Sequence, residues 1–337
     1  MVQRTENWNV TWRRHRSRSY WSWRRSSRRW RQASRSPAHL WARWSVEKLE
    51  SLDLRSQLWT LPGLIGILAR EMNRITERFA QLKKNSQKGF VVYIGAGDPD
   101  LKSTYDLALA FDKIGVDILE LGVPFSDPLA DGLVNQLAAQ RGLASGTTPS
   151  KVLETVAAIR KQSQIPIVFY IYYNLLHRYG VKKFIQECAK VGVDGLLVLD
   201  LPPEESENYE ALMAEAGVCN IYLIAPTTPD DRIELIVKRG TGFIYYVSRI
   251  GVTGMQAKIS DTISEMTAKI RAHTDLPIAV GFGISNPEQA KTVASFGEAI
   301  VVGSAIVNQI AEHGKSPELV KRTTDFVKSL VDAVKLT

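Results

Sequence analysis

Eight short apolar runs, each followed by a helical pattern, alternate over residues 72–337 of this 337-residue chain. Each run is a nearly continuous series of aliphatic, β-branched or aromatic residues, which is typical of a parallel strand that is buried on both faces. The predicted strands are residues 90–96, 116–123, 165–173, 193–201, 220–225, 242–249, 277–283 and 298–303. This alternation restricts the fold to the class that wraps helices around a parallel sheet.

Helical patterns fill the intervals between these strands. The predicted helices are residues 102–114, 149–162, 181–191, 204–216, 230–238, 261–273, 287–295 and 317–334. Eight strand–helix units of this total length match an α/β (β/α)8 TIM barrel, which we predict for residues 72–337. The alternative is a doubly wound open sheet, but such sheets usually have fewer strands, and no Gly-x-Gly-x-x-Gly follows the first strand.

An extra helix is predicted in front of the first strand. The sequence from Met72 onward places Ile75, Phe79 and Leu82 at the spacing of one helix face. We therefore expect an N-terminal helix to belong to the barrel domain.

Residues 1–71 are a different kind of sequence. They hold 14 Arg and one Lys against four Glu and one Asp, a net charge of +10, whereas residues 72–337 have a net charge of −2. All eight Trp residues also lie in this segment. Because it shows neither the spacing of a helix face nor strand alternation, we expect a disordered Arg/Trp-rich extension.

Three interpretations of the extension remain open. A mis-set start codon would make Met72 the natural first residue. An Arg- and Ser-rich leader that is poor in acidic residues is typical of an organellar transit peptide. A basic arm with aromatic side chains could instead bind nucleic acid by phosphate pairing and base stacking.

The composition argues against several classes of protein and site. No run of eighteen apolar residues occurs, so no transmembrane helix and no membrane partner are expected. Cys188 and Cys219 are the only cysteines, which excludes a disulfide scaffold and a Cys-built zinc site and fits a reducing compartment. The five His residues lack metal-ligand spacing, so no metal site is predicted. We expect a cytoplasmic protein, or one of an organellar stroma if the extension is a transit peptide.

Glu120 interrupts the second apolar run. Active-site residues of such barrels lie at the carboxyl ends of the strands and in the following loops, so we expect this carboxylate to point into the barrel mouth. Burial without a cationic partner raises the pKa of a carboxyl group, which suits a donor and acceptor of protons near neutral pH. The alternative is a structural Glu paired with Lys or Arg at the rim.

Asp131 lies on the long loop after the same strand. It could be a second carboxylate that faces Glu120 across the mouth. The alternative is a purely structural role, because Asp131-Gly132 is also a common turn dipeptide.

Glycines follow three consecutive strands of the predicted barrel. They occur in Thr253-Gly254, in Gly281-Phe282-Gly283 and in Gly303-Ser304. Such loops let backbone N–H groups approach an anion, and a helix start adds a favourable dipole. We therefore predict a phosphomonoester site, the alternative being that these glycines only permit tight turns.

Apolar and aromatic residues at the remaining strand ends are expected to line a pocket for a flat apolar group. They are Tyr93, Tyr170, Leu197, Leu199, Leu223, Tyr245 and Phe282. For each residue taken alone, packing in the barrel core is the alternative.

The run Leu119-Glu120-Leu121-Gly122-Val123-Pro124-Phe125-Ser126-Asp127-Pro128-Leu129-Ala130-Asp131-Gly132 resembles the signature of the tryptophan synthase alpha subunit family. Gly97-Asp98-Pro99, Ser248-Arg249, Gly251-Val252-Thr253-Gly254, Gly281-Phe282-Gly283-Ile284-Ser285 and Gly303-Ser304-Ala305-Ile306-Val307 follow in the family's order. The resemblance covers about residues 72–334. It implies a TIM-barrel lyase of tryptophan biosynthesis that cleaves indole-3-glycerol phosphate to indole and glyceraldehyde 3-phosphate by a retro-aldol reaction.

The resemblance also implies roles for individual residues. Glu120 would be the general acid–base, Asp131 would hydrogen-bond the indole N–H, and Thr253 would close over the site and orient Asp131. The residues implied in phosphate binding are Gly254, Gly283, Gly303 and Ser304. The other implied substrate contacts are Tyr93, Tyr170, Leu197, Tyr245 and Phe282.

The resemblance implies no cofactor and no metal in this chain. It implies a beta subunit as partner, which carries pyridoxal phosphate and takes up the indole, in an alpha2-beta2 heterotetramer. Two residues depart from the family pattern: Leu133 replaces the usual Pro on the loop that faces the beta subunit, and Tyr93 stands where Phe is more usual.

Two other functions remain possible at this point. Another phosphate-binding barrel lyase or isomerase would predict a Lys or a second Asp at key strand ends, and the strand ends offer no such Lys. A nucleic-acid-binding protein would act through the basic extension with the barrel as a scaffold, although we do not expect nucleic acid as a partner.

Overall fold

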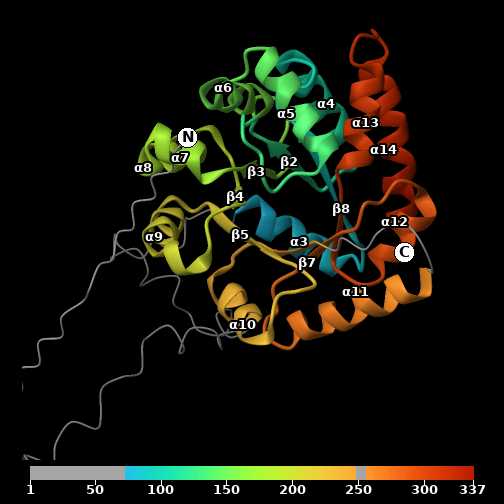
Figure 1. The fold of residues 1–337 in the computed structure, drawn as a ribbon. Helices are drawn as coiled ribbons and strands as arrows, with labels where there is room; N and C mark the ends of the chain where they lie inside the picture. The colour runs from blue at the N-terminus through green and yellow to red at the C-terminus, as the bar shows by residue number, and fades with distance from the viewer. Residues whose placement is uncertain (1–72, 248–255) are drawn as a thin grey trace, which may run out of the picture. The chain divides into compact units, whose positions relative to one another are not determined.

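The computed structural model describes residues 73–247 and 256–337, except for the side chains of residues 256–260. In this part of the chain, eight parallel strands close into a barrel in sequence order, so that the last strand pairs with the first (Figure 1). The strands are β1 (Gly89–Gly95), β2 (Ile118–Gly122), β3 (Ile167–Ile171), β4 (Gly195–Val198), β5 (Cys219–Ile224), β6 (Ile244–Val247), β7 (Ile278–Gly281) and β8 (Ala299–Val302). The predicted TIM barrel is confirmed, and the open sheet is wrong.

The predicted helices are also present, with small shifts at their ends. They are α3 (Arg74–Lys84), α4 (Leu101–Lys113), α6 (Pro149–Ile159), α8 (Val181–Val191), α9 (Glu207–Ala216), α10 (Asp230–Arg239), α11 (Gln256–Arg271), α12 (Pro287–Ala294) and α14 (Leu319–Lys335). A short 3₁₀ turn, η3 (Pro203–Glu205), precedes α9. The predicted extension over residues 1–71 lies outside the described residues.

Within residues 73–247 and 256–337, three further helices were not predicted: α5 (Leu133–Ala144), α7 (Tyr173–Tyr179) and α13 (Ser304–His313). In α5 the buried residues are Ala138 and Gly142, whereas the leucines at 133, 137 and 143 are exposed. This helix therefore lacks the apolar face by which a pattern of hydrophobic residues reveals a helix.

The predicted third strand extends too far. β3 ends at Ile171, and α7 begins at Tyr173. The reason is a long-range contact, because the carboxylate of Asp200 accepts the N–H of Tyr173 at 2.6 Å and so satisfies one of the free donors at the start of this helix.

Two apolar layers hold the barrel together. Alternate residues of each strand point outward into a layer shared with the helices, or inward into a layer that fills the barrel. In β1, for example, Val92 belongs to the outer layer and Val91 to the inner layer. Because both faces of each strand are buried, the strands appear in the sequence as continuous apolar runs.

Helix α3 closes the amino-terminal end of the barrel. Its Ile75, Phe79 and Leu82 pack into the inner layer, where the ring of Phe79 lies 5.7 Å from that of Phe243 between centroids. The helix begins behind Asn73, whose side chain accepts the N–H of Ile75. The predicted N-terminal helix is thus confirmed as part of the barrel domain.

Four side chains hold the starts of the odd-numbered strands. In each case, two hydrogen bonds join a residue near the start of an odd-numbered strand to a residue just before the following strand. The second residue donates its backbone N–H to the carbonyl of the first. Its side-chain oxygen accepts the backbone N–H of the first. The four pairs are Asp117 with Phe90, Asp194 with Ile167, Thr241 with Asn220, and Glu298 with Ile278, and their side-chain bonds measure 2.6, 2.8, 2.8 and 2.8 Å. We call these pairs the strand clasps.

Basic residues neutralise the two most buried clasps. Asp194 forms ion pairs with Arg74 at 2.9 Å and with Arg160 at 2.7 Å. Asp117 forms ion pairs with Arg78 at 2.9 Å and with Lys335 at 2.6 Å. Because Arg74 and Arg78 belong to α3, the same helix that fills the base of the barrel also supplies counter-charges to the clasps.

Replacing Asp194 by Ala should lower the free energy of unfolding by about 3–5 kcal/mol, because a buried cation loses its partner and a strand N–H loses its acceptor. The affected cation is Arg160, which is only 10% exposed. Urea unfolding at pH 7 measures the change. As a control, Asp325→Ala breaks an exposed pair with Lys321 and should cost less than about 1 kcal/mol. Equal effects of the two substitutions would contradict the role of the clasp.

Candidate active site

Glu120 lies inside the barrel, at the middle position of β2. It is 3% exposed, and it shares the inward-facing side of the strand with Ile118. The parallel register places it opposite Tyr93 of β1. The side chain of Glu120 therefore points into the barrel, as the sequence predicts.

The surroundings of Glu120 favour its protonated form. No Lys or Arg side chain forms an ion pair with it within residues 73–247 and 261–337, so in that part of the chain it is not a rim carboxylate held by a cation. Burial raises the pKa of Glu120 to about 8, and the negative charge of Asp131 adds to the shift. A carboxyl group with this pKa can both donate and accept a proton near neutral pH.

Asp131 is held by two tyrosines at the mouth of the barrel. Tyr170 donates to one carboxylate oxygen at 2.7 Å, and Tyr172 donates to the other at 2.9 Å. The hydroxyl of Tyr172 also accepts the backbone N–H of Ala130 at 2.9 Å. Asp131 does lie in a turn, because its backbone N–H donates to the carbonyl of Pro128. Its side chain, however, accepts hydrogen bonds from the two tyrosines and not from the backbone of the turn.

The sequence analysis did not identify Tyr172 as a site residue, because the predicted third strand ran to residue 173 and included it. A usable signal was present, because Tyr170 and Tyr172 are two residues apart and such residues point to the same side of an extended chain. Both hydroxyls reach the same carboxylate as a result.

Aromatic side chains surround these carboxylates. The rings of Tyr93 and Tyr170 meet edge to face with centroids 5.0 Å apart. The Tyr93 ring crosses β2 at Gly122, where a Cβ atom would lie 2.6 Å from its hydroxyl oxygen, so a larger residue would displace this ring. Burial raises the pKa of Tyr93 and of Tyr245, and the charge of Glu120 adds to both shifts.

The other predicted pocket residues divide between the two layers. Leu197 lies in the inner layer beside Tyr170, and Tyr245 packs against the same layer from β6. Phe282 instead packs against the outer layer. Its contact with a ligand therefore stays a prediction.

A candidate anion site lies at the ends of β7 and β8. Gly283 adopts a φ of 57°, which favours glycine, and Gly303 precedes α13, whose first residue is Ser304. The register pairs Gly281 with Val301, so the two loops begin side by side. The free N–H groups and the dipole of a helix start attract anions. Thr253 and Gly254 lie outside the described residues.

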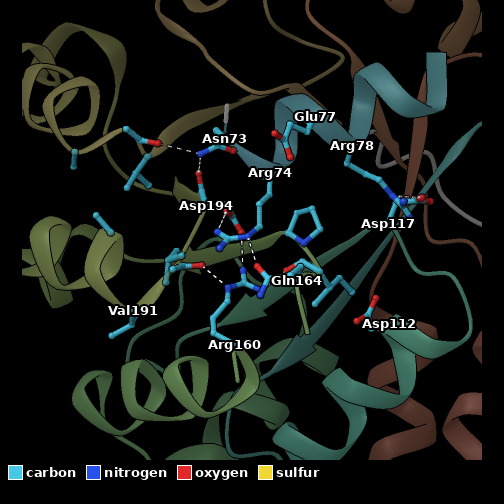
Figure 2. Close-up of a pocket in the computed structure, with 18 of the residues that line it drawn as sticks. Asn73, Arg74, Glu77, Arg78, Asp112, Asp117, Arg160, Gln164, Val191 and Asp194 are labelled. Atoms are coloured by element: carbon cyan, nitrogen blue, oxygen red, sulfur yellow. Dashed lines mark hydrogen bonds and ion pairs between the residues drawn. The ribbon is translucent and has the colours of Figure 1, made fainter. Parts of the chain in front are cut away.

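A large cavity lies at the opposite end of the barrel. It has a volume of about 1010 Å³, and residues at the starts of the strands and of α3 line it. Figure 2 shows Arg74 and Arg160 directed at Asp194, and Arg78 directed at Asp117. Because these charges already serve the strand clasps, we assign this end to stability and the carboxyl end to function.

Two further properties bear on function. Within the described residues, no group of three or more His, Cys, Asp and Glu side chains is arranged to hold a metal ion. In the same residues, no helix is long and apolar enough to cross a lipid bilayer.

Comparison with known proteins connects this geometry to a family. The family model "Tryptophan synthase alpha chain" matches residues 79–335. The tryptophan synthase alpha chain of Opitutus terrae is 51% identical over 247 residues, which cover 73% of this chain and 93% of that protein. The alpha chain of Geotalea uraniireducens is 46% identical over 264 residues, covering 78% of this chain and 98% of its own.

Solved structures agree with the sequence matches. The tryptophan synthase alpha subunit of Legionella pneumophila superposes with a TM-score of 0.73 at 34% identity, covering 79% of this chain and all of that chain. A chain of the tryptophan synthase complex of Pyrococcus furiosus superposes with a TM-score of 0.67 at 34% identity, covering 73% of this chain and 99% of its own.

The raised pKa of Glu120 predicts a pH-dependent loss of stability. The folded chain keeps this proton up to about pH 8, whereas a carboxyl group with the ordinary pKa of 4.5 loses it earlier in the unfolded chain. Stability contributed by this group should therefore fall as the pH rises between these values. Glu120→Gln should unfold like the parent at pH 4 and be more stable by about 3–5 kcal/mol at pH 9.

Urea unfolding at pH 4, 7 and 9 measures this difference. The control is Glu318→Gln, which changes an exposed carboxylate paired with Arg322 and should give no such trend. A difference between Glu120→Gln and the parent that stays constant with pH would rule out the raised pKa.

Proposed function

Because the chain belongs to the tryptophan synthase alpha chain family, and is thus a lyase-type enzyme, we propose that it cleaves indole-3-glycerol phosphate to indole and glyceraldehyde 3-phosphate. One observation carries the proposal: a buried Glu120 with a pKa of about 8 shares the barrel mouth with the tyrosine-held Asp131. An anion site at the start of α13 completes the features that this substrate requires.

Glu120 supplies the proton chemistry of the cleavage. In its protonated form it donates a proton to C3 of the indole ring, which turns the ring into an indolenine cation. The bond between C3 and the glycerol carbon then breaks, and its electron pair restores the aromatic ring. The hydroxyl on that carbon loses its proton to Glu120 and becomes the aldehyde, so the carboxyl group ends as it began.

Asp131 stabilises the charge that develops on the ring. As C3 is protonated, positive charge spreads to the ring nitrogen, and a carboxylate that accepts the N–H lowers the energy of this state. The side chain is pre-oriented because both of its oxygens are already hydrogen-bonded. Pre-orientation matters because it avoids reorganisation during the reaction.

The phosphoryl group anchors the other end of the substrate. We assign it to backbone N–H groups at Gly283, Gly303 and Ser304, with Gly254 as a further predicted contact, whereas Thr253 is predicted to close over the site and orient Asp131. Tyr93, Tyr170, Leu197, Tyr245 and Phe282 are the predicted contacts of the indole and glycerol parts. No cofactor takes part in these steps, and pyridoxal phosphate is expected only in the beta subunit.

The beta subunit is the proposed partner, in an alpha2-beta2 heterotetramer. Four exposed leucines lie on the loop after β2 and on α5, which follows that loop. They are Leu129, Leu133, Leu137 and Leu143, and the first two are 93% and 70% exposed. Clustered exposed apolar residues of this kind mark protein interfaces. Leu133, which replaces the family's usual Pro, would lie in this interface.

Glu120→Gln should lower the rate of indole release by about 10²–10⁴-fold, because Gln cannot donate or accept the transferred proton. Substrate binding should persist, since the anion site and Asp131 are unchanged. The assay mixes the purified chain with indole-3-glycerol phosphate and follows indole. Asp131→Asn is the companion variant, and it should also lose most of the activity. Parent-like turnover in either variant would remove that residue from the mechanism.

Leu133→Asp should weaken association with the tryptophan synthase beta chain of the same organism by about 10-fold or more, because it places a charge in an apolar contact. Leu336→Asp is the matched control, as Leu336 is 83% exposed but lies at the end of the chain. Titration calorimetry gives both affinities, and thermal melting checks that each variant is folded. Equal affinities for the two variants would place the interface elsewhere.

A further inference from the structure

We propose that Tyr170 is a positioning residue for Asp131, which it holds together with Tyr172 in the orientation that accepts the indole N–H before substrate binds. The proposal rests on the proposed function and deepens it. It gives Tyr170 a role beyond lining the pocket.

The geometry divides the two carboxylate oxygens between the two tyrosines. Tyr170 donates to Oδ1 at 2.7 Å, and Tyr172 donates to Oδ2 at 2.9 Å. One donor alone would let the carboxylate turn about its own bond, whereas donors on both oxygens fix its plane. Each carboxylate oxygen has about two acceptor positions, so a position remains free for the indole N–H.

The two tyrosines hold different parts of the same loop. Tyr172 also accepts the backbone N–H of Ala130, so it fixes the main chain beside Asp131. Tyr170 contacts the side chain of Asp131, and its own backbone lies in β3 opposite Gly122 of β2. Tyr170 thus connects the carboxylate of Asp131 to the hydrogen-bonded sheet of the closed barrel.

The ring of Tyr170 is itself held in place. It meets the ring of Tyr93 edge to face, with an angle of 69° between the ring planes. Aromatic pairs of this geometry are attractive. Movement of the Tyr170 ring that carried its hydroxyl away from Asp131 would therefore also disturb the contact with Tyr93.

Both hydroxyls stay hydrogen-bond donors throughout the neutral range. Burial raises the pKa of Tyr170 and of Tyr172 above the ordinary value of 10, and the charge of Asp131 adds to each shift. A hydroxyl that keeps its proton is a constant donor to the carboxylate.

Tyr170→Phe separates the two functions of this side chain. It keeps the ring, and with it the wall of the pocket and the contact with Tyr93, and it removes only the hydroxyl. If Tyr170 acts through Asp131, the variant should lose discrimination for the ring N–H. If Tyr170 is only a wall, ligands with and without an N–H should be affected alike.

The experiment measures ligand affinity in the Glu120→Gln background, where the substrate binds without reacting. The two ligands are indole-3-glycerol phosphate and its benzofuran analogue, in which oxygen replaces the ring N–H. Adding Tyr170→Phe should weaken binding of the first ligand by about 10-fold, since a hydrogen bond to a charged group is lost, and should change the second by less than about 2-fold. With Glu120 intact, Tyr170→Phe should lower kcat by about 10-fold.

Two further variants complete the test. Tyr172→Phe should likewise weaken binding of indole-3-glycerol phosphate more than binding of the benzofuran analogue. Tyr209→Phe changes a buried tyrosine of α9 outside the site and should leave both affinities unchanged. Equal losses for both ligands, or no loss for either, would overturn the role of Tyr170. If the unaltered chain released no indole at all, the proposed function itself would fail, which is a distinct outcome.

Discussion

The strand clasps are the interaction on which the site depends. In a parallel barrel, a slip of one residue between neighbouring strands turns every side chain to the opposite face. The clasp of Asp117 on Phe90 fixes β1 against β2 by a backbone and a side-chain bond at once. Three residues further along, this register places Tyr93 opposite Glu120 inside the barrel. The Glu120 carboxylate is therefore aligned from the other end of its own strand.

Buried carboxyl groups have different roles at the two ends of the barrel. Asp117 and Asp194 are buried like Glu120, but each contacts two basic side chains and a strand N–H. Glu120 has no such ion pair in the part of the chain that the structure describes, and burial raises its pKa to about 8. At Asp194 burial also raises the pKa, but Arg160 and Arg74 oppose that shift, whereas at Glu120 the charge of Asp131 adds to it.

The sequence predicts those features that local patterns determine. All eight strands could be located because burial on both faces leaves continuous apolar runs. Glu120 stood out because it interrupts such a run. The end of β3 could not be located, since the contact of Asp200 with Tyr173 joins residues far apart in the chain. Helices α5, α7 and α13 were missed; α5 buries little of its apolar surface.

Two of the clasps coincide with a short repeated motif in the sequence. Gly-Val-Asp occurs twice, ending in Asp117 and in Asp194, and each copy leads into an even-numbered strand. Asn73 connects the start of α3 to two loops at the amino-terminal end of the barrel. Its side chain caps α3 and donates to the carbonyls of Asp194 at 2.8 Å and Gly217 at 3.1 Å. A polypeptide translated from Met72 would keep these hydrogen bonds. Removal of Asn73 by a peptidase would take away the cap of α3 and both of its bonds to the barrel loops.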